Sequence, residues 1–197
     1  KLIIDSGKNI FDAEEKQRAQ KKAADIKEKE EEKERIKEKT DFELAEMEIH
    51  RSLRYKHPFT IIYIDIDDFK AINDSFGHSK GDHVLRAVAQ TIQEEIRSTD
   101  KVARLGGDEF VVLLPETGFE AAEVISSKIR RVSVEITQRE AWPITFSMGG
   151  VTFTGPPPKV DEILRISDGL MYAVKNGGKN GIKHEIYPMD QNNLRKG

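Results

Sequence analysis

The sequence contains no cysteine, no long apolar run and little excess charge. Without cysteine the chain has no disulfide and no thiolate metal site, which is typical of a reducing compartment. No stretch of about 18 apolar residues and no signal-like start is present, so we expect a soluble, cytoplasmic segment without direct membrane contact. A formal net charge of −3 excludes nucleic acid as a partner held by bulk charge.

Glycine and proline are absent from residues 12 to 56, where glutamate, lysine and arginine dominate. This composition is typical of a long exposed helix, and pairs such as Glu31 with Arg35 support it at i,i+4 spacing. A seven-residue ladder runs through Ala19, Ile26, Lys33, Thr40 and Met47. Its polar members make a poor seam, so a solvated single helix or linker and a weak coiled coil both stay open.

Residues 1–41 are therefore assigned to a charged helical linker, residues 42–187 to one domain and residues 188–197 to a tail. The chain begins at Lys1 rather than methionine. We expect it to be a fragment of a longer protein whose upstream sensor domain is missing from it. Whether the full protein is anchored in a membrane does not follow from these residues.

From Phe59 the pattern alternates between strand-like and helix-like segments. Apolar, β-branched runs predict strands at 59–66, 102–105, 109–115, 144–153 and 183–187. Amphipathic spacing predicts helices at 67–76, from 81 onward, at 119–136 and at 160–175. Hairpin and helical connections together predict an α+β fold with a mixed, mainly antiparallel sheet flanked by helices.

Acidic residues stand at two predicted bends. Asp65 and Asp67 end the first strand, and Asp108 and Glu109 follow the Gly-Gly of a predicted hairpin, where glycine reaches positive φ at little cost. Like charges brought together raise one another's pKa unless a cation compensates. Oxygen ligands without His or Cys suit Mg²⁺ or Mn²⁺, which bind substrate phosphates. Solvated surface acids are the alternative for each pair taken alone.

Four motifs occur together in the second part of the chain: DIDDFKAIND (65–74), GHSKGDHVL (77–85), RLGGDEF (104–110) and YAVKNGGKNG (172–181). In this order and at these separations they resemble the diguanylate cyclase family, known by its GGDEF domain. The resemblance covers about residues 42 to 187 and is specific, because four motifs agree.

The resemblance implies a nucleotidyl-cyclase fold, which is palm-like and ferredoxin-like. It also implies that two GTP molecules, one held by each half of a homodimer, are joined into cyclic di-GMP with release of two pyrophosphates. Each 3′-hydroxyl attacks the α-phosphate of the other nucleotide, assisted by two Mg²⁺ or Mn²⁺ ions per active site. Dimerisation is then part of catalysis.

The resemblance also assigns the acids. Asp65 and Asp108 match the acidic metal ligands, with the backbone carbonyl of Ile66 as a further ligand. Glu109 matches a position that acts either as a metal ligand or as the group that helps to deprotonate the 3′-hydroxyl. Asp65, Asp108 and Glu109 are therefore the expected catalytic residues.

The matched substrate-binding positions are Phe69, Lys70, Asn73, Asp82, Gly106, Gly107, Lys175 and Lys179. Asn73 and Asp82 match the guanine readers, since a carboxylate accepts from guanine N1–H and the exocyclic amine while an amide donates. Taken alone, Asp82 would be a helix N-cap.

Two further pairs match phosphate contacts. Phe69 and Lys70 match contacts to the terminal phosphates, and Lys175 and Lys179 match cations that hold the triphosphate. The family more often has arginine at the second lysine; lysine keeps the charge but loses the planar fork. Taken alone, the two lysines belong to an ordinary helix C-cap.

Arg97 and Asp100 match the RxxD site at which cyclic di-GMP binds as an inhibiting product. The alternative is a plain helix end followed by a turn. The family's Asp-x-Leu-Thr-Gly-Leu-x-Asn-Arg element is missing where this chain reads EKERIKEKTDFELA. A catalytically silent receptor for cyclic di-GMP or GTP is therefore the alternative function, and a cyclase of relaxed purine choice is a third.

Overall fold

The computed structural model describes residues 57–155 and 159–187 without interruption, together with residues 16–18, 20–29, 32, 47, 49–51 and 54–55. The chain divides into two units, Lys1–Thr40 and Asp41–Gly197. In the first unit the described residues are helical and exposed. Most of the seven-residue ladder and the tail at 188–197 lie outside the described residues, so the coiled coil stays a prediction.

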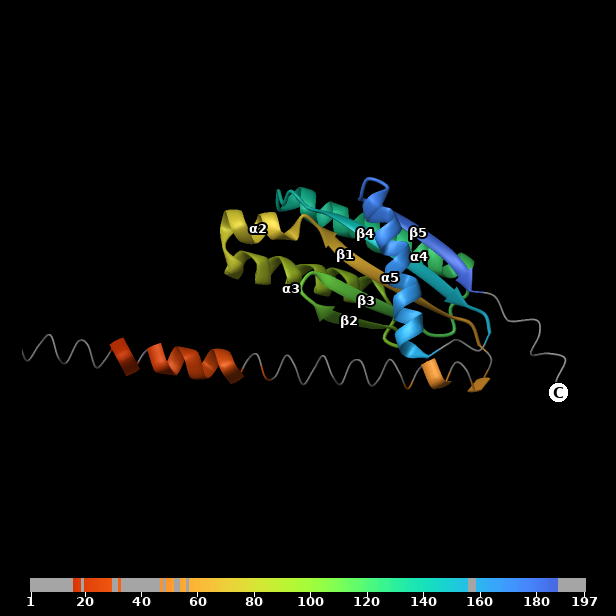
Figure 1. Cartoon of the computed structure of the whole chain (residues 1–197), viewed down its shortest axis with the longest axis horizontal. Coiled ribbons are helices and arrows are strands. Elements are labelled where there is room, and N and C mark those ends of the chain that lie inside the picture. The colour runs from red at the N-terminus through yellow and green to blue at the C-terminus, as the bar shows by residue number, and fades with distance from the viewer. Residues whose placement is uncertain are drawn as a thin grey trace, which may run out of the picture. The chain divides into compact units, whose positions relative to one another are not determined.

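The second unit follows the predicted order of strands and helices (Figure 1). Its elements are β1 (Phe59–Asp67), α2 (Phe69–Phe76), α3 (His78–Glu95), β2 (Lys101–Gly106), β3 (Glu109–Leu114), α4 (Phe119–Arg139), β4 (Thr145–Phe153), α5 (Val160–Asn176) and β5 (Gly181–Tyr187). Among the described residues, no helix is both long and apolar enough to cross a membrane.

The five strands form one sheet in the order β2-β3-β1-β4-β5 (Figure 1). All pairs are antiparallel except β4 and β5, which are parallel and joined by α5. Every residue of the central strand β1 is buried, as its unbroken apolar run requires of a strand covered on both faces. The predicted mixed, mainly antiparallel α+β fold is confirmed.

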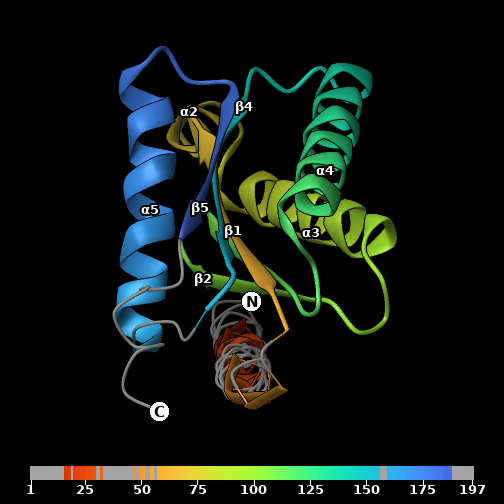
Figure 2. The same ribbon diagram turned by 90° about the vertical axis from the view of Figure 1, so that its right-hand side faces the viewer.

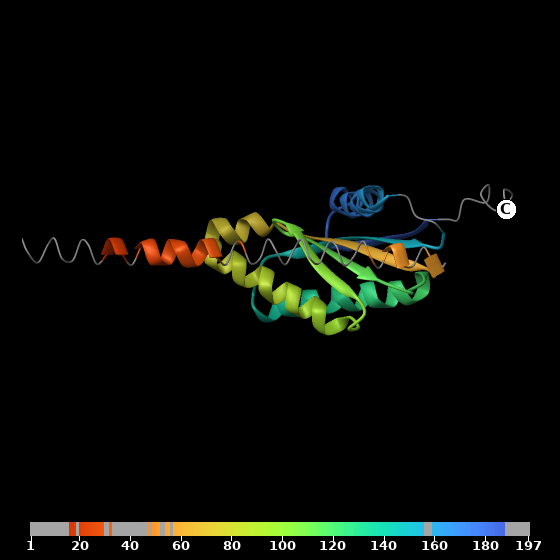
Figure 3. The same cartoon turned by 90° about the horizontal axis from the view of Figure 1, so that it is seen from below.

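Helices cover both faces of the sheet: α5 lies on one side, α3 and α4 on the other (Figures 2 and 3). Alternate residues of β1 serve the two cores, so that Ile62 and Ile64 face α3 and α4 whereas Ile61 and Tyr63 face α5. Helix α5 comes close to β4 because Gly149 carries no side chain there. This close contact places the end of α5 beside the end of β1.

The start of α3 differs from the prediction. The helix begins at His78 rather than at Gly81, because Gly77, with φ of 81°, ends α2 and immediately precedes α3. The first turn of α3 has no apolar side chain, so amphipathic spacing could not reveal it. Asp82 therefore lies inside the helix, and its interpretation as an N-cap is wrong.

A chain of buried hydrogen bonds crosses the sheet. The Thr60 hydroxyl donates to the Thr117 carbonyl at 3.0 Å, so the Thr152 hydroxyl, 2.7 Å away, must donate to Thr60. His184 Nε2 lies 2.9 Å from the Thr152 oxygen and must therefore carry the proton. His184 Nδ1 is buried and has no hydrogen-bond partner among the described residues, which is the arrangement of a neutral imidazole.

We expect this histidine to make stability depend on pH. Burial lowers the pKa of His184 from 6.5, and the charge of Glu123 on α4 opposes that change only in part. The unfolded chain then binds more protons than the folded chain below about pH 6.5. The contribution of the neutral His184 ring to the free energy of unfolding is therefore fully present above about pH 6.5 and decreases as the pH falls. Urea unfolding from pH 7.5 to 5.0 should show a steeper decline for the wild type than for His184→Gln; parallel declines would contradict this.

Candidate active site

Two acidic segments meet at one end of the central strand. The antiparallel register places Asp65 opposite Glu109, and the Ile66 amide donates to the Asp108 carbonyl at 3.2 Å. Between β2 and β3 the chain turns at Gly107, whose φ of 55° favours glycine. The predicted hairpin is confirmed, and it brings Asp108 to the end of β1.

Asp65 is a buried carboxylate with one free oxygen. The residue is 3% exposed. Its Oδ2 lies 2.6 Å from Lys175 Nζ, and its Oδ1 has no hydrogen-bond partner among the described residues. Burial raises the pKa of Asp65; Lys175 opposes this, whereas the charge of Asp108 adds to it. An unpartnered oxygen beside a second carboxylate is an environment that a cation stabilises.

Glu109 of β3 lies near Tyr63 of β1. Tyr63 precedes Asp65 by two residues and therefore shares its face of the strand. Burial, followed by the charge of Glu109 and a hydrogen bond with it, raises the pKa of Tyr63 well above its usual range. The phenol therefore stays protonated. Sequence reasoning missed Tyr63, although its i,i−2 spacing from Asp65 was a signal that the two share a face.

Lys179 pairs with Asp68 across the site. Lys179 Nζ lies 2.7 Å from Asp68 Oδ1, and this hydrogen bond raises the pKa of the lysine, which is exposed. Both residues have positive φ, 63° and 61°, a backbone state that costs free energy for residues with side chains and is typical of functional sites. The structure thus brings both predicted lysines to the end of β1, Lys175 to Asp65 and Lys179 to Asp68.

Helix α2 begins directly after these acids. Phe69 is buried in the core and Lys70 is exposed, and no side chain among the described residues caps the helix N-terminus. Backbone N–H groups at a helix N-terminus favour anions. The Phe69 side chain itself cannot reach a phosphate, so any contact there must come from its backbone.

Asn73 packs directly against Gly81, the residue that precedes Asp82. A Cβ at Gly81 would overlap the Asn73 side chain and lie 3.2 Å from the Phe69 ring. Asp82 follows Gly81 directly and is exposed, whereas Asn73 is half-buried. Helices α2 and α3 therefore present the two predicted guanine readers from adjacent positions.

We expect Gly81→Ala to impair this pair specifically. The added methyl group must displace the Asn73 side chain, because it would overlap the side-chain oxygen of that residue. Isothermal titration with GTP should show affinity reduced by about tenfold or more, whereas affinity for inorganic triphosphate should hardly change. Equal losses for both ligands would contradict a role confined to the base.

Arg97 and Asp100 lie at the turn after α3. Asp100 is buried, and its Oδ2 accepts from the Arg97 backbone amide at 2.9 Å. The Thr99 hydroxyl donates to Asp100 Oδ1 at 3.4 Å. Arg97 is exposed, so its guanidinium is accessible while Asp100 also stabilises the turn.

The protein side chains at this site supply only some of the ligands that a hard cation such as Mg²⁺ needs. Among the described residues, no three His, Cys, Asp or Glu side chains gather closely enough to hold a metal ion. Asp65 Oδ1, however, is a buried acceptor without a partner there, and Asp108 is near enough to act on its pKa. Mg²⁺ usually takes one or two carboxylates and completes its shell with water and substrate phosphates. The residues present therefore fit a cation that arrives with a phosphate ligand.

Comparison with known proteins shows the family of this chain. The family model described as "Diguanylate cyclase, GGDEF domain" matches residues 36–181. Diguanylate cyclase DosC of Escherichia coli K12 is 34% identical over 140 residues, which covers 69% of this chain and 30% of that protein. The chain spans about a third of the length of the curated relatives it matches.

Solved structures agree with the sequence comparison. The GGDEF domain of DgcB from Caulobacter crescentus, in complex with c-di-GMP, has a TM-score of 0.64 and 28% identity, and covers 74% of this chain and 87% of that one. The active GGEEF domain of a diguanylate cyclase from Vibrio cholerae has a TM-score of 0.61 and 32% identity, with 74% and 93% covered.

Fold and site thus define an α+β domain with two acidic segments meeting at the end of its central strand. This chain belongs to the diguanylate cyclase family and carries its GGDEF domain. The family resemblance predicted from the sequence is therefore confirmed.

Proposed function

We propose that this chain is the catalytic domain of a cyclase that condenses two GTP molecules into cyclic di-GMP and two pyrophosphates. The observation that carries the proposal is the meeting of Asp65 and Asp108, with an unpartnered carboxylate oxygen between a buried strand and a hairpin. Membership of the diguanylate cyclase family and similarity to a domain solved with c-di-GMP support it.

Asp65, Asp108 and the Ile66 carbonyl would hold Mg²⁺ or Mn²⁺, with Glu109 as a further ligand or as a base. When bound, such ions, two per active site, polarise the transferring phosphoryl group and lower the pKa of an attacking hydroxyl. Asp65 is now paired with Lys175 at 2.6 Å. This lysine therefore serves as the counter-ion of Asp65 and can turn to a phosphate when nucleotide enters.

The remaining residues position the nucleotide. Lys175, Lys179 and the first backbone amides of α2, at Phe69 and Lys70, bind the triphosphate, and the Gly106-Gly107 backbone leaves room for it. Asn73 and Asp82 read guanine. Glycines in the hairpin allow a close approach by the ligand because they carry no side chain.

The reaction requires a second copy of the chain. The 3′-hydroxyl oxygen of one GTP forms a bond to the α-phosphorus of the other. The bond between that phosphorus and the oxygen bridging to the β-phosphate breaks, and pyrophosphate leaves. The hydroxyl proton passes to Glu109 or to water. Repetition in the opposite direction closes the ring. A homodimer, set by a sensor domain upstream, is therefore part of the proposal.

Arg97 and Asp100 would take the product as an inhibitor. The exposed guanidinium of Arg97 can form a fork with a phosphate or with the Hoogsteen edge of guanine. Asp100 is already used in its turn, so most of the affinity at this site would come from Arg97.

Product analysis by mass spectrometry tests the proposed function. The purified chain is incubated with GTP and Mg²⁺ at several protein concentrations, with EDTA as the control. We expect cyclic di-GMP with a rate that rises more steeply than protein concentration. Absence of product, even with the domain fused to an enforced dimer, together with calorimetric binding of cyclic di-GMP, would replace the cyclase with the silent receptor.

A further inference from the structure

The strained part of the site is the turn between α5 and β5, residues 178–180, which carries Lys179. Its three residues have positive φ in succession: 118° at Gly178, 63° at Lys179 and 50° at Asn180. Only the first is glycine. Such a conformation persists for residues with side chains only where surrounding contacts hold it. The 178–180 turn must therefore be held by its neighbours.

Asn180 is held from two sides. Its backbone amide donates to Asp67 Oδ2 at 3.1 Å. The Arg130 guanidinium, from α4, donates both to the Asn180 carbonyl at 2.9 Å and to its side-chain oxygen at 3.0 Å. The Asp67 carboxylate of β1 and the Arg130 guanidinium of α4 thus both hydrogen-bond to Asn180.

The Asp67 side chain is itself fixed in place by burial and by hydrogen bonds. Its residue is 1% exposed, and it also accepts the Thr145 hydroxyl at 2.6 Å and the Ser147 hydroxyl at 2.7 Å, both from β4. All its partners are donors, so the carboxylate is satisfied as an anion. It lies two residues after Asp65 and fixes the turn to the strand that carries the metal carboxylate.

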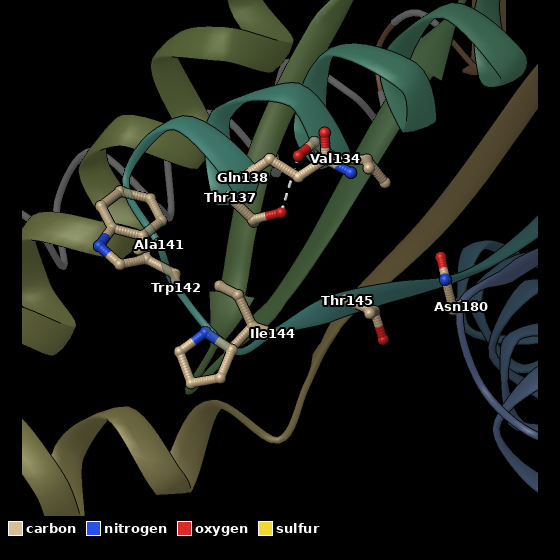
Figure 4. A pocket seen from close by; sticks show the side chains of 9 residues that line it. Val134, Thr137, Gln138, Ala141, Trp142, Ile144, Thr145 and Asn180 are labelled. Carbon is tan, nitrogen blue, oxygen red and sulfur yellow. Dashed lines mark hydrogen bonds between the residues drawn. The ribbon is translucent and has the colours of Figure 1, made fainter.

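Packing alone does not hold the turn. A cavity of about 340 Å³ lies between the end of α4 and the start of β4 and reaches Asn180. Figure 4 shows Thr145 and Asn180 at one end of this cavity and Trp142 at the other. On this side the turn has open space, so hydrogen bonds decide its position. The Lys179 amide donates to the Val174 carbonyl of α5 at 3.0 Å, and Asp67 and Arg130 hold the next residue, Asn180.

We propose that Asp67 and Arg130 are positioning residues for triphosphate recognition. They hold Asn180 in place, and the adjoining Lys179 therefore points toward the end of β1. Because the turn is already ordered, Lys179 can bind the phosphates without a further loss of conformational entropy in the turn. This inference rests on the proposed function, because it takes Lys179 as a phosphate contact. Pre-ordering of this kind increases affinity by reducing the entropy lost on binding.

Binding of 3′-deoxyGTP, which lacks the attacking hydroxyl, tests the inference without turnover. With Mg²⁺, Asp67→Ala and Arg130→Met should each raise Kd by about tenfold. Asp67→Asn keeps an oxygen acceptor for Asn180 and should stay near the wild type. In a Lys179→Met background neither change should weaken binding further, because both act through that lysine.

Hydrogen exchange of the Asn180 amide gives a second readout. In Arg130→Met the acceptor Asp67 remains, so faster exchange there reports a looser turn. Arg131→Met is the matched control, since Arg131 is exposed and pairs with Glu135 on the same helix. Thr152→Val removes a buried hydrogen bond elsewhere in the sheet and controls for general loss of stability; neither should alter Kd.

The outcomes separate the two claims. Wild-type protein that does not bind 3′-deoxyGTP overturns the proposed function and the inference with it. Wild-type binding with unchanged Kd in Asp67→Ala and Arg130→Met, or with effects that multiply in the Lys179→Met background, overturns the inference alone. Slow Asn180 exchange in Arg130→Met would likewise show that α4 does not hold the turn.

Discussion

Asp108→Ala should abolish cyclic di-GMP synthesis while leaving the fold intact. We expect the rate to fall by about three orders of magnitude or more, because the variant loses one of two carboxylates that would hold the cation stabilising the transferring phosphoryl group. Thermal stability should not fall. The charge of Asp108 raises the pKa of buried Asp65, so its removal relieves repulsion between like charges.

The combination of lost activity and retained stability is the diagnostic result. Product would be measured by mass spectrometry at saturating GTP and Mg²⁺, and unfolding by calorimetry. Glu135→Ala removes an exposed acid on α4, whose partner is Arg131, and is the matched control with unchanged activity. Cyclic di-GMP made by Asp108→Ala at a rate near that of the wild type would show that the hairpin acid is not at the reacting centre.

Gly149→Ala should cause a large loss of stability. A Cβ at this position would overlap the Ser167 carbonyl and the Met171 amide of α5. Both are backbone atoms, so relief requires the helix to move off the sheet. We expect the free energy of unfolding to fall by about 3 kcal/mol or more, measured by urea denaturation. Since α5 ends beside Asp65, activity should fall even in the fraction that stays folded.

Gly169→Ala in α5 should have the opposite effect on stability. Nothing lies within 4 Å of a Cβ built there, and alanine is favoured over glycine in a helix interior by about 1 kcal/mol. This variant should therefore be slightly more stable than the wild type. Comparable destabilisation by both alanines would mean that the close approach of α5 to β4 is not what Gly149 provides.

Much of the fold follows from local patterns. The apolar run of β1 and the amphipathic spacing of α4 and α5 identify elements within a few residues of their bounds. The Gly-Gly signal also locates the hairpin that delivers Asp108 to β1. Those predictions succeed because periodicity and turn chemistry are properties of neighbouring residues.

Contacts between distant segments were not predictable in the same way. Asp67 appears in the sequence as one more acid of a cluster, yet its partners are hydroxyls of β4 and the Asn180 amide. Finding them requires the register of β1 with β4 and the parallel placement of β5. The pairing of Lys175 with Asp65 likewise depends on how closely α5 approaches the sheet, which Gly149 decides.

The place of β1 in the sheet has a consequence for synthesis on the ribosome. This strand is made first but lies in the middle, between β3 and β4, so its two edges stay unpaired until much later segments emerge. Pairings between distant segments also slow folding. A nascent chain that ends before β4 would expose one side of β1 and leave the Asp67 carboxylate without its hydroxyl partners. We therefore expect such chains to need protection from aggregation until β4 is complete.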